Sequence, residues 1–360
     1  MRSPASPLLS QAPIQLISFA IPSRASYHRA AEANARVRTA FGMSSEFFET
    51  QDNPAPARAR IGFLTSRDGK RLRHAVFGPT SHPLKGTVVV LPGRNECIEK
   101  YFETVRDLAG RGFGVATFDW RGQGASERLL SDPQRGYVDS FNDYVGDLEQ
   151  LFEEVVLPDC RGPYFILAHS TGSLVALLSA ASMVNRVQRM VLIAPLIELK
   201  GMGVSTRWVR RISTALYSLG LGGMYMGGGP RPRETKPFAT NVLTTDHNRY
   251  RRNTRIYEEH PHLALGGPTV AWVHAACMAV DAITDPAFLQ RVQIPIVIVG
   301  AGSDEVVSTP AVEAYARALR GASMLTIDGA RHEILQEADV YREQLFAAFD
   351  AFIPGNDGLR

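Results

Sequence analysis

The chain has 360 residues, of which 45% are hydrophobic and 21% charged, with 39 Lys and Arg against 36 Asp and Glu. These values are typical of a globular protein of one or two domains and exclude collagen-like and disordered chains. The small positive excess, without a basic tract that carries aromatic residues, gives no reason to expect nucleic acid as a partner.

The first 55 residues differ in composition from the rest, since they are rich in Ala, Pro, Ser and Arg. Residues 27–41 form one short predicted helix, and the apolar run at 14–21 is shorter than a signal peptide requires. We expect residues 1–55 to be an arm that is partly disordered or packed on the surface. Secretion and a membrane-associating arm are the alternatives. No run of 18 apolar residues occurs, so no membrane-spanning helix is predicted.

From residue 56 onward, short apolar runs alternate with segments of helical periodicity. A predicted hairpin turns at Asp68-Gly69 and leads into a strand at 72–77. The further predicted strands are 87–91, 114–118, 164–168, 190–194, 295–299 and 324–327. The predicted helices are 98–109, 137–156, 171–184, 310–319 and 339–352.

This alternation predicts an α/β fold with a mostly parallel sheet and helices on both faces. Residues 196–285 interrupt the alternation with glycine-rich pieces, a cluster of arginines and irregular helical segments. We expect them to form a mainly helical cap over one end of the sheet, and residues 56–195 and 286–355 to form the core. The three cysteines, Cys97, Cys160 and Cys277, are odd in number and far apart, so no disulfide framework is expected.

The candidate nucleophile is Ser170, which lies where a predicted strand runs into a predicted helix. The sequence Ala168-His169-Ser170-Thr171-Gly172 is a Gly-x-Ser-x-Gly elbow with Ala in place of the first Gly. The small residues permit the sharp turn that lifts the hydroxyl above the strand ends. A structural serine in a tight turn is the alternative, and His169 is interpreted as a packing residue.

An elbow serine needs a base and an acid that orients the base, in the chain order Ser, acid, His. Of the nine histidines, only His332 follows the strand predicted at 295–299. Asp304, in the loop that leaves this strand, is the preferred acid, and Glu305 and Asp328 are the alternatives.

Acyl transfer also needs donors for the developing oxyanion. Pro92-Gly93 follows the strand at 87–91, and Gly93 lets the backbone turn close to a substrate. We expect the backbone N–H groups of Arg94 and Thr171 to form the oxyanion hole. An ordinary turn is the alternative for Pro92-Gly93.

Four stretches resemble α/β-hydrolases of the serine aminopeptidase-like branch that holds bacterial lysophospholipases and monoacylglycerol lipases. They are 91–96, with Pro92 where lipases often have His, 118–126, 168–172 and 329–333. Two further segments, 241–244 and 266–269, are more similar to the lysophospholipases. The resemblance covers roughly residues 60–353. Within 118–126, the glycines lack the order of a nucleotide-binding loop, so Asp119, Arg121 and Ser126 are expected to hold the crevice walls through hydrogen bonds.

The resemblance implies an α/β-hydrolase fold and a serine ester hydrolase of lipid metabolism that acts on a lipid with one acyl chain, first a lysophospholipid. The alternatives are a monoacylglycerol lipase or general carboxylesterase, then a transacylase, then a non-catalytic lipid-binding protein. The chemistry needs no metal and no cofactor. We expect a cytoplasmic protein, with peripheral membrane contact as a further expectation. The oligomeric state is left open.

The substrate-binding residues are expected within 196–285 but are not assigned. This segment holds eleven Lys and Arg against seven Asp and Glu. A solvated surface is one interpretation. The other is a basic rim, including Arg249, Arg251 and Arg252, that attracts phosphate head groups or an anionic membrane. The apolar residues expected to line an acyl channel are Leu216, Leu219, Leu221, Met224 and Met226.

Overall fold

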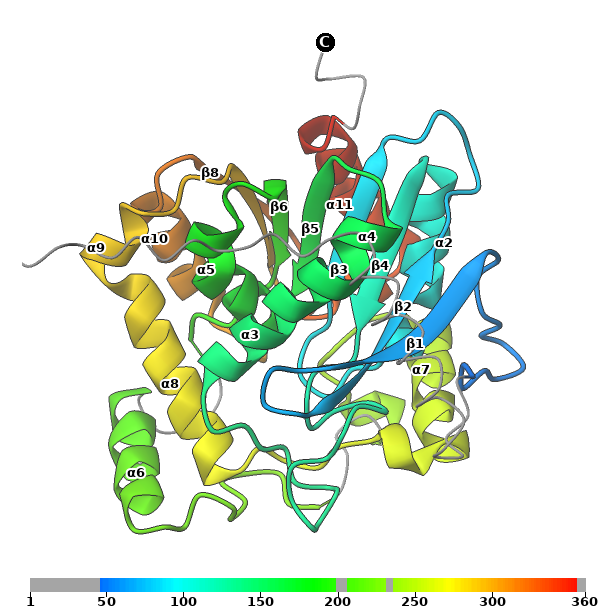
Figure 1. Ribbon diagram of the computed structural model, residues 1–360. Coiled ribbons are helices and arrows are strands. Elements are labelled where there is room, and N and C mark those ends of the chain that lie inside the picture. The colour runs from blue at the N-terminus through cyan, green and yellow to red at the C-terminus, as the bar shows by residue number, and fades with distance from the viewer. Residues whose placement is uncertain (1–45, 199–205, 231–235, 355–360) are drawn as a thin grey trace, which may run out of the picture. The chain divides into compact units, whose positions relative to one another are not determined.

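The computed structural model describes residues 46–198, 206–230 and 236–354, and Figure 1 shows how their helices and strands are arranged. The helix expected at 27–41 and the apolar run at 14–21 lie outside the described residues.

An eight-stranded sheet forms the centre of the described fold, in the order β1-β2-β4-β3-β5-β6-β7-β8. The strand pairs β1–β2 and β2–β4 are antiparallel, and all the other pairs are parallel. The strands are β1 (Ala59–Thr65), β2 (Arg71–Phe77), β3 (Gly86–Leu91), β4 (Phe113–Phe118), β5 (Tyr164–His169), β6 (Val187–Ile193), β7 (Ile296–Ala301) and β8 (Ala322–Ile327). This confirms the mostly parallel α/β sheet, including the hairpin at Asp68-Gly69.

Every residue of β3, β4 and β7 is buried, as their continuous apolar sequences predict for strands covered on both faces. The helices that connect the strands are η1 (Ile98–Tyr101), α2 (Phe102–Gly110), α3 (Phe141–Leu151), the π-helical turn η2 (Phe152–Val156), α4 (Leu157–Asp159), α5 (Thr171–Met183), α10 (Thr309–Ala318), η6 (Ile334–Gln336) and α11 (Asp339–Phe352). In Figure 1, α3 and α5 lie in front of the sheet and α2 and α11 behind it.

The segment between β6 and β7 is mainly helical in its described part. It contains α6 (Thr206–Ser218), η4 (Phe238–Thr240), α7 (His247–Glu259), η5 (Pro261–Leu263), α8 (Val270–Thr284) and α9 (Pro286–Leu289). We call residues 196–285 the insertion. None of the helices in the described stretches is both long and apolar enough to cross a bilayer.

The helix expected to begin at Tyr137 begins four residues later. Ser140 caps α3, since its hydroxyl accepts from Asn142 N while Asp143 accepts from the Ser140 N–H, which forms a capping box. The preceding residues pair with the insertion instead, where Thr269 N donates to Gly136 O (2.9 Å). A contact with a residue 133 positions away in the chain therefore delays the start of the helix relative to its periodicity.

Residues 46–55, the described end of the expected arm, pack against the core. The Phe47 ring stacks on Phe77 at 5.7 Å and meets Phe102 edge-on at 5.3 Å. Phe48 N donates to Glu99 Oε1 (3.1 Å). All three cysteines are free, as expected.

Candidate active site

Ser170 lies at the tip of a strained turn between β5 and α5. Its φ of 51° and ψ of −111° are values that non-glycine residues rarely adopt. Hydrogen bonds hold the turn, since Ser170 N donates to Ile193 O (2.9 Å) and Ser170 O accepts from Leu174 N and Leu196 N (both 3.2 Å). The serine is thereby fixed at the carboxyl end of β5, and 8% of its surface is exposed.

Gly172 allows α5 to begin close to the end of β3. A Cβ at this position would lie 2.4 Å from Leu91 O and 2.6 Å from Pro92 O, far inside ordinary contact. The second small residue of the elbow is therefore required, and the chain around Pro92 lies beside the start of α5. Ala168, which replaces the first Gly, is buried in β5 between β3 and β6.

His332 and Asp304 lie beside Ser170, in the loops that follow β8 and β7. His332 Nε2 is 3.0 Å from Ser170 Oγ, and His332 Nδ1 is 2.7 Å from Asp304 Oδ2. The other carboxylate oxygen of Asp304 accepts from Val306 N (2.7 Å) and Val307 N (2.9 Å). Both oxygens are therefore occupied, and the imidazole ring is held between a hydroxyl and a carboxylate.

The structure brings Asp304 to the histidine and neither of the alternative acids. Asp304 is buried, whereas Glu305 and Asp328 are exposed. Burial by itself raises the pKa of Asp304, but His332 and the two backbone N–H groups lower the pKa below its ordinary value. The carboxylate is thus ionised over the neutral pH range.

Buried side chains hold the loop that follows β3, residues 92–97. Trp120 Nε1 donates to Pro92 O (2.8 Å), and Asn95 N donates to Gln123 Oε1 (2.6 Å). Gly93 N donates to Glu96 Oε2. The backbone of this loop is fixed on both sides of Arg94.

The two expected oxyanion donors come from segments that meet beside the serine. Thr171 is the first residue of α5, and Arg94 lies in the loop that approaches α5 at Gly172. The guanidinium of Arg94 extends toward the insertion, where it donates to Gly266 O and lies 5.4 Å from the Trp272 ring. The role of the Arg94 and Thr171 N–H groups stays a prediction.

His169 is not a packing residue, and that interpretation is wrong. Its ring is buried in a polar cluster, with Nδ1 3.2 Å from Glu96 Oε2 and Nε2 3.1 Å from the backbone oxygen of His332. Sequence reasoning missed this contact because Glu96 and His169 are 73 residues apart and neither follows a recognisable spacing. The only available signal was a polar residue at the end of β5 and another in the loop after β3.

A buried lysine extends the same cluster to the loop of His332. Lys100 Nζ lies 3.0 Å from Glu96 Oε1 and 2.6 Å from Glu333 Oε1. Tyr101 donates its hydroxyl to Glu96 Oε2. All these side chains are buried.

The loop 119–126 is held by hydrogen bonds in the way the sequence predicts. Asp119 accepts from Ile98 N (2.9 Å), from Ala125 N (2.8 Å) and from the Arg73 guanidinium (2.7 Å). Ser126 donates to Asp119 O (2.6 Å). At Gly124, with φ of 53°, a Cβ would lie 2.3 Å from Asp119 Cγ, so a glycine is required there.

Arg121 connects the same loop to two other elements. It forms paired hydrogen bonds with Asp147 of α3 (2.7 and 2.6 Å) and with Asp68 of the β1–β2 turn (2.8 and 2.9 Å). The bidentate geometry fixes the orientation of the guanidinium as well as its position.

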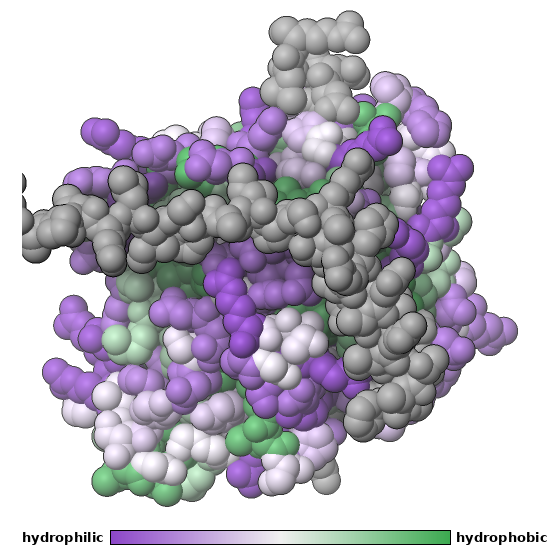
Figure 2. Space-filling model, viewed as in Figure 1, coloured by the Kyte–Doolittle hydropathy of each residue, from purple (hydrophilic) through white to green (hydrophobic). Residues whose placement is uncertain are grey.

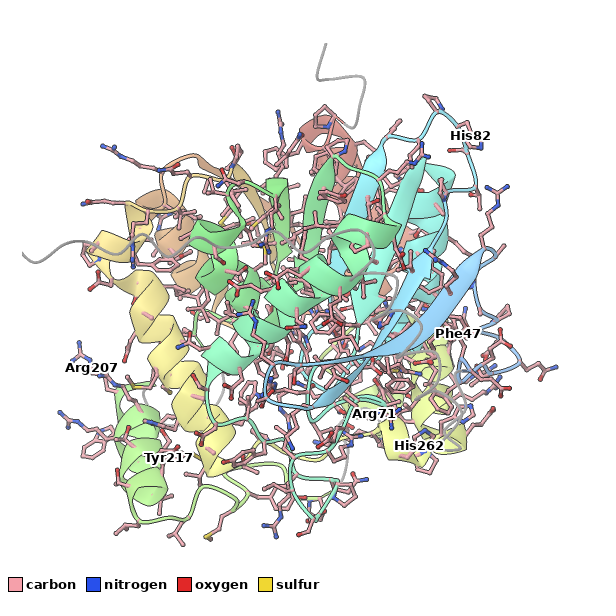
Figure 3. All side chains as sticks on the ribbon, viewed as in Figure 1. Phe47, Arg71, His82, Arg207, Tyr217 and His262 are labelled. Carbon is pink, nitrogen blue, oxygen red and sulfur yellow. The ribbon has the colours of Figure 1, made fainter. Side chains whose placement is uncertain are left out.

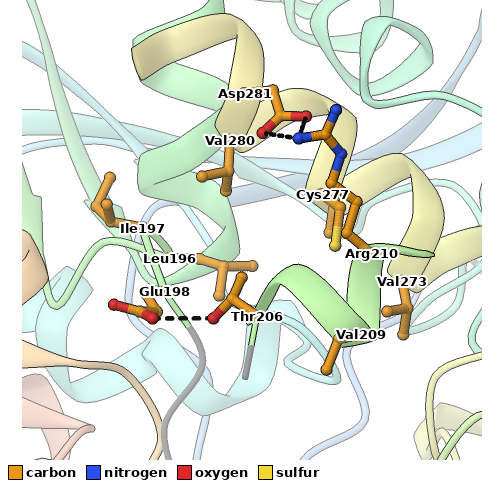
Figure 4. Close-up of a pocket in the computed structure, with 11 residues that line it drawn as sticks. Leu196, Ile197, Glu198, Thr206, Val209, Arg210, Val273, Cys277, Val280 and Asp281 are labelled. Carbon is orange, nitrogen blue, oxygen red and sulfur yellow. Dashed lines mark hydrogen bonds and ion pairs between the residues drawn. The ribbon is translucent and has the colours of Figure 1, made fainter. Parts of the chain in front are cut away.

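A pocket lies beneath α6 and α8, where the chain leaves β6 (Figure 4). It is partly open to solvent. Most of its lining is apolar, from Leu196, Ile197, Val209, Val273, Ala276, Cys277 and Val280. The polar groups pair with each other, since Thr206 donates to Glu198 (2.9 Å) and Arg210 pairs with Asp281 (3.0 Å), as Figure 4 shows. The backbone contact between Leu196 and Ser170 places one end of the lining next to the serine.

The residues expected to line an acyl channel lie elsewhere. Leu219, Leu221 and Met224 are exposed, at 73%, 38% and 52%, and none of the five expected residues lines this pocket. Val209 of α6 is buried, whereas the chain that follows α6 lies on the surface.

Two of the three arginines expected in a basic rim are instead joined to core carboxylates. Arg249 forms ion pairs with Glu103 of α2 (2.7 Å) and Asp339 of α11 (2.6 Å), and Arg252 also pairs with Glu103. Burial by itself raises the pKa of Glu103, but Arg249, Arg342 and Arg252 together lower the pKa well below its ordinary value. Only Arg251 is exposed. Arg249 and Arg252 therefore hold α7 against the core and are not available to a head group.

Comparison with known proteins identifies the family. The family described as serine aminopeptidase, S33, of the Hydrolase_4 type matches residues 82–339. The chain belongs to this S33 hydrolase family. It is therefore an enzyme, and the resemblance found in its four motifs is confirmed.

Among relatives of this S33 hydrolase, lysophospholipase L2 of Escherichia coli K12 is 35% identical over 275 residues, which cover 74% of this chain and 79% of that protein. A probable lysophospholipase L2 of Haemophilus influenzae is 30% identical over 294 residues, covering 81% and 91%. Human monoglyceride lipase is 33% identical over 134 residues, which cover 37% of this chain and 42% of that protein.

Solved structures confirm the α/β-hydrolase fold. A soluble variant of the Saccharomyces cerevisiae monoglyceride lipase has a TM-score of 0.64 at 18% identity, covering 87% of this chain and 97% of that chain. The Paleococcus ferrophilus monoacylglycerol lipase has a TM-score of 0.62 at 21% identity, covering 79% and 98%.

Proposed function

We propose that this S33 hydrolase cleaves a carboxylic ester of a lipid through an acyl-enzyme on Ser170. The observation that carries the proposal is the unbroken line of hydrogen-bond distances from Ser170 through His332 to Asp304. A serine in a strained elbow, a base within reach and an ionised acid behind the base are the parts of nucleophilic catalysis.

In this mechanism Ser170 Oγ attacks the ester carbonyl carbon while its proton passes to His332 Nε2. Asp304 holds the tautomer and stabilises the imidazolium that forms. The Arg94 and Thr171 N–H groups stabilise the oxyanion, helped by the N-terminus of α5. His332 then gives its proton to the leaving alcohol. A water molecule, deprotonated by His332, then attacks the carbonyl carbon of the acyl-enzyme. His332 returns this proton to Ser170 Oγ as the bond between Oγ and the acyl group breaks and the fatty acid leaves.

The test is turnover of Ser170→Ala, His332→Ala and the double variant, each checked for folding. Members of a triad act as a unit, so we expect each single variant to lose nearly all turnover and the double variant to be no worse. A Ser170→Ala protein that kept more than about a tenth of the wild-type rate would exclude Ser170 as the nucleophile.

A lysophospholipid is the proposed substrate, and a monoacylglycerol is the second candidate. The names of the two bacterial relatives, which match along most of their length, support the first. The human relative and the fold neighbours support the second. Comparing kcat/KM for lysophosphatidylcholine and a monoacylglycerol with the same acyl chain separates them. The balance of free acid to diacyl product separates hydrolysis from transacylation.

We propose that the apolar pocket beneath α6 and α8 takes the acyl chain, with residues 196–285 acting as a cap over a core of 56–195 and 286–355. The apolar lining and the backbone contact between Leu196 and Ser170 support this. Ala276→Phe fills the pocket, so kcat/KM should fall at least about tenfold for a long-chain ester and little for an acetate ester. Ala282→Phe places the same side chain on the exposed side of α8 as the control. Equal losses on both esters would exclude the pocket as the acyl site.

We also propose peripheral contact between the outer face of α6 and a phospholipid surface. Trp208 and Ile212, four residues apart and so on one side of α6, are exposed at 55% and 45%, and Leu219, directly after the helix, is exposed at 73%. Arg207 and Arg211 directly precede Trp208 and Ile212 in the chain, and Arg207 projects outward in Figure 3. At the lower left of Figure 2, a green patch lies at the edge of the molecule among white and purple residues. An amphipathic helix with aromatic and basic residues suits a membrane interface that includes anionic lipid.

The fluorescence of Trp208 tests this contact, because the other two tryptophans are buried. Vesicles of phosphatidylcholine with phosphatidylglycerol should shift the emission to shorter wavelength, and high salt should weaken the shift. Trp208→Ser with Ile212→Ser should abolish co-sedimentation, whereas Val340→Ser, an exposed apolar residue of α11, should not. Equal sedimentation of all variants would exclude α6 as the contact.

A further inference from the structure

We propose that His169 and Glu96 form a positioning pair, which fixes the backbone of His332 and of the loop after β3 relative to the nucleophile. The pair touches no reacting atom, and the proposal rests on the proposed roles of Ser170 and His332. Its basis is one continuous line of contacts: the carbonyl of His332, the His169 ring, the Glu96 carboxylate and the Gly93 N–H.

The hydrogen-bond partners determine the protonation of the His169 ring. The backbone oxygen of His332 can only accept, so Nε2, at 3.1 Å, carries a hydrogen. Nδ1 lies 3.2 Å from both oxygens of the Glu96 carboxylate, which also only accept when the group is ionised. Both ring nitrogens therefore donate, and His169 is an imidazolium.

The charges that surround the ring agree with this assignment. Glu96 and Glu333 are negative, Lys100 is positive, and all lie in one cluster with His169. The cluster is neutral only if His169 is protonated, and an uncompensated buried charge is costly. The other titratable groups nearby are the Tyr101 hydroxyl, on Glu96, and the His332 ring, with its centroid 4.8 Å from that of His169.

The acidities support the same state. Burial by itself lowers the pKa of His169, but the Glu96 carboxylate beside it raises the pKa above its ordinary value. Burial by itself raises the pKa of Glu96, but Lys100 and His169 lower it well below its ordinary value. The ion pair therefore persists at neutral pH.

The pair links the three segments that must be in register for the reaction. His169 immediately precedes Ser170, its Nε2 holds the main chain of His332, and Glu96 holds Gly93, next to the expected donor Arg94. Asp304 orients the His332 ring, whereas His169 fixes its backbone. A Cβ on Gly93 would lie 2.8 Å from both Glu96 Oε2 and His169 Nδ1, so the loop approaches the pair as closely as a glycine allows.

Two variants of His169 separate positioning from general support of the fold. His169→Leu removes both hydrogen bonds, whereas His169→Gln keeps a donor near the position of Nε2. Ser173→Ala is the control, because Ser173 is buried in α5 and donates to Ala168 O (2.8 Å) outside the cluster. Rates on a short soluble ester are normalised to the sites labelled by a fluorophosphonate, so that misfolded protein does not count.

A shift of about 1 Å in the base costs on the order of 100-fold in rate, so we expect such a fall in kcat for His169→Leu. KM should stay within about twofold, and His169→Gln should recover a large part of kcat. The ¹⁵N signals of the His169 ring are identified as those present in the wild-type spectrum at pH 7.5 and absent from that of His169→Gln. They should be the signals of a doubly protonated ring. In Glu96→Gln they should become those of a neutral ring.

The positioning pair is overturned if kcat for His169→Leu is close to that of Ser173→Ala, or if the His169 ring is neutral in the wild type. If Ser170 is still labelled by the fluorophosphonate in that case, the proposed function stands. A wild-type protein that is not labelled at Ser170 overturns both proposals.

Discussion

Replacing Gly172 by Ala tests how tightly the elbow is built against the end of β3. The new Cβ would lie 2.4 Å from Leu91 O and 2.6 Å from Pro92 O. An ordinary carbon contact is about 3.5 Å, so either α5 or the strand end must move by about 1 Å. A displacement of about 1 Å between nucleophile and oxyanion donors costs about 100-fold in rate. The strain itself costs about 1–3 kcal/mol of stability, of which the helix preference of Ala offsets about 0.5–1 kcal/mol.

The assay is the second-order rate constant for fluorophosphonate labelling of Ser170, measured with the melting temperature of the same sample. Gly146→Ala is the matched control, because Gly146 lies within α3 and its new Cβ meets nothing within 4 Å. It should react like the wild type and melt at a slightly higher temperature, whereas Gly172→Ala should react far more slowly and melt lower. A Gly172→Ala protein labelled within about threefold of the wild-type rate would refute the reasoning, since it would mean that the close approach does not position the serine.

Two further predictions concern stability. The pKa of Asp304 is lowered in the folded protein, so its contribution to stability is present above the ordinary value near 4 and is lost as pH falls through the folded value. The difference in melting temperature between wild type and Asp304→Asn should therefore be constant from neutral pH to about 5 and shrink below about 4. A difference that grows with acid would contradict the assignment. Replacing both Arg249 and Arg252 by Gln removes the two ion pairs between α7 and Glu103 of α2 and leaves Glu103 with Arg342, so the melting temperature should fall, while Arg251→Gln, on the exposed side of α7, should change it little. Equal melting temperatures for these two proteins would mean that the ion pairs do not hold α7.

The hydrophobic pattern predicted much of the fold. The order of the strands and of the polar residues that follow them predicted which side chains lie in the candidate site. Strands such as 87–91 and 295–299 are continuous apolar runs. When such runs alternate with helical segments, buried parallel strands are the structure they predict. The same order puts the loops after β5, β7 and β8 at one edge of a parallel sheet. The choice of Asp304 over Glu305 followed from position alone, and the structure gives the physical reason, because only Asp304 faces inward to His332.

Contacts between residues far apart in the sequence account for what was missed. The periodicity at 137–140 is helical, yet Gly136 pairs with Thr269, and the helix begins only after the Ser140 cap. The composition of the insertion revealed an excess of arginine but not that Arg249 faces Glu103, which is 146 residues away. The sequence alone does not show which charged residues lie close together, so ion pairs between distant residues can be assigned only from the structure.

His169 shows the same limit inside the site. Its neighbour in the sequence is the candidate nucleophile, and a ring beside a strained turn is reasonably interpreted as packing. Its partners, Glu96 and the carbonyl of His332, lie on two other loops. Glu96 follows β3, the neighbour of β5, whereas His332 follows β8, which is separated from β5 by β6 and β7, so only the folded sheet brings these residues together.

The most direct test of the central claim is to trap the acyl-enzyme. The enzyme is mixed with lysophosphatidylcholine, quenched in acid within the first turnovers, digested and analysed by mass spectrometry. We predict that the peptide containing Ser170 gains the mass of the acyl chain, and that the adduct is absent from Ser170→Ala. An acyl group on another residue, or free fatty acid formed by the Ser170→Ala protein at the wild-type rate, would contradict the account.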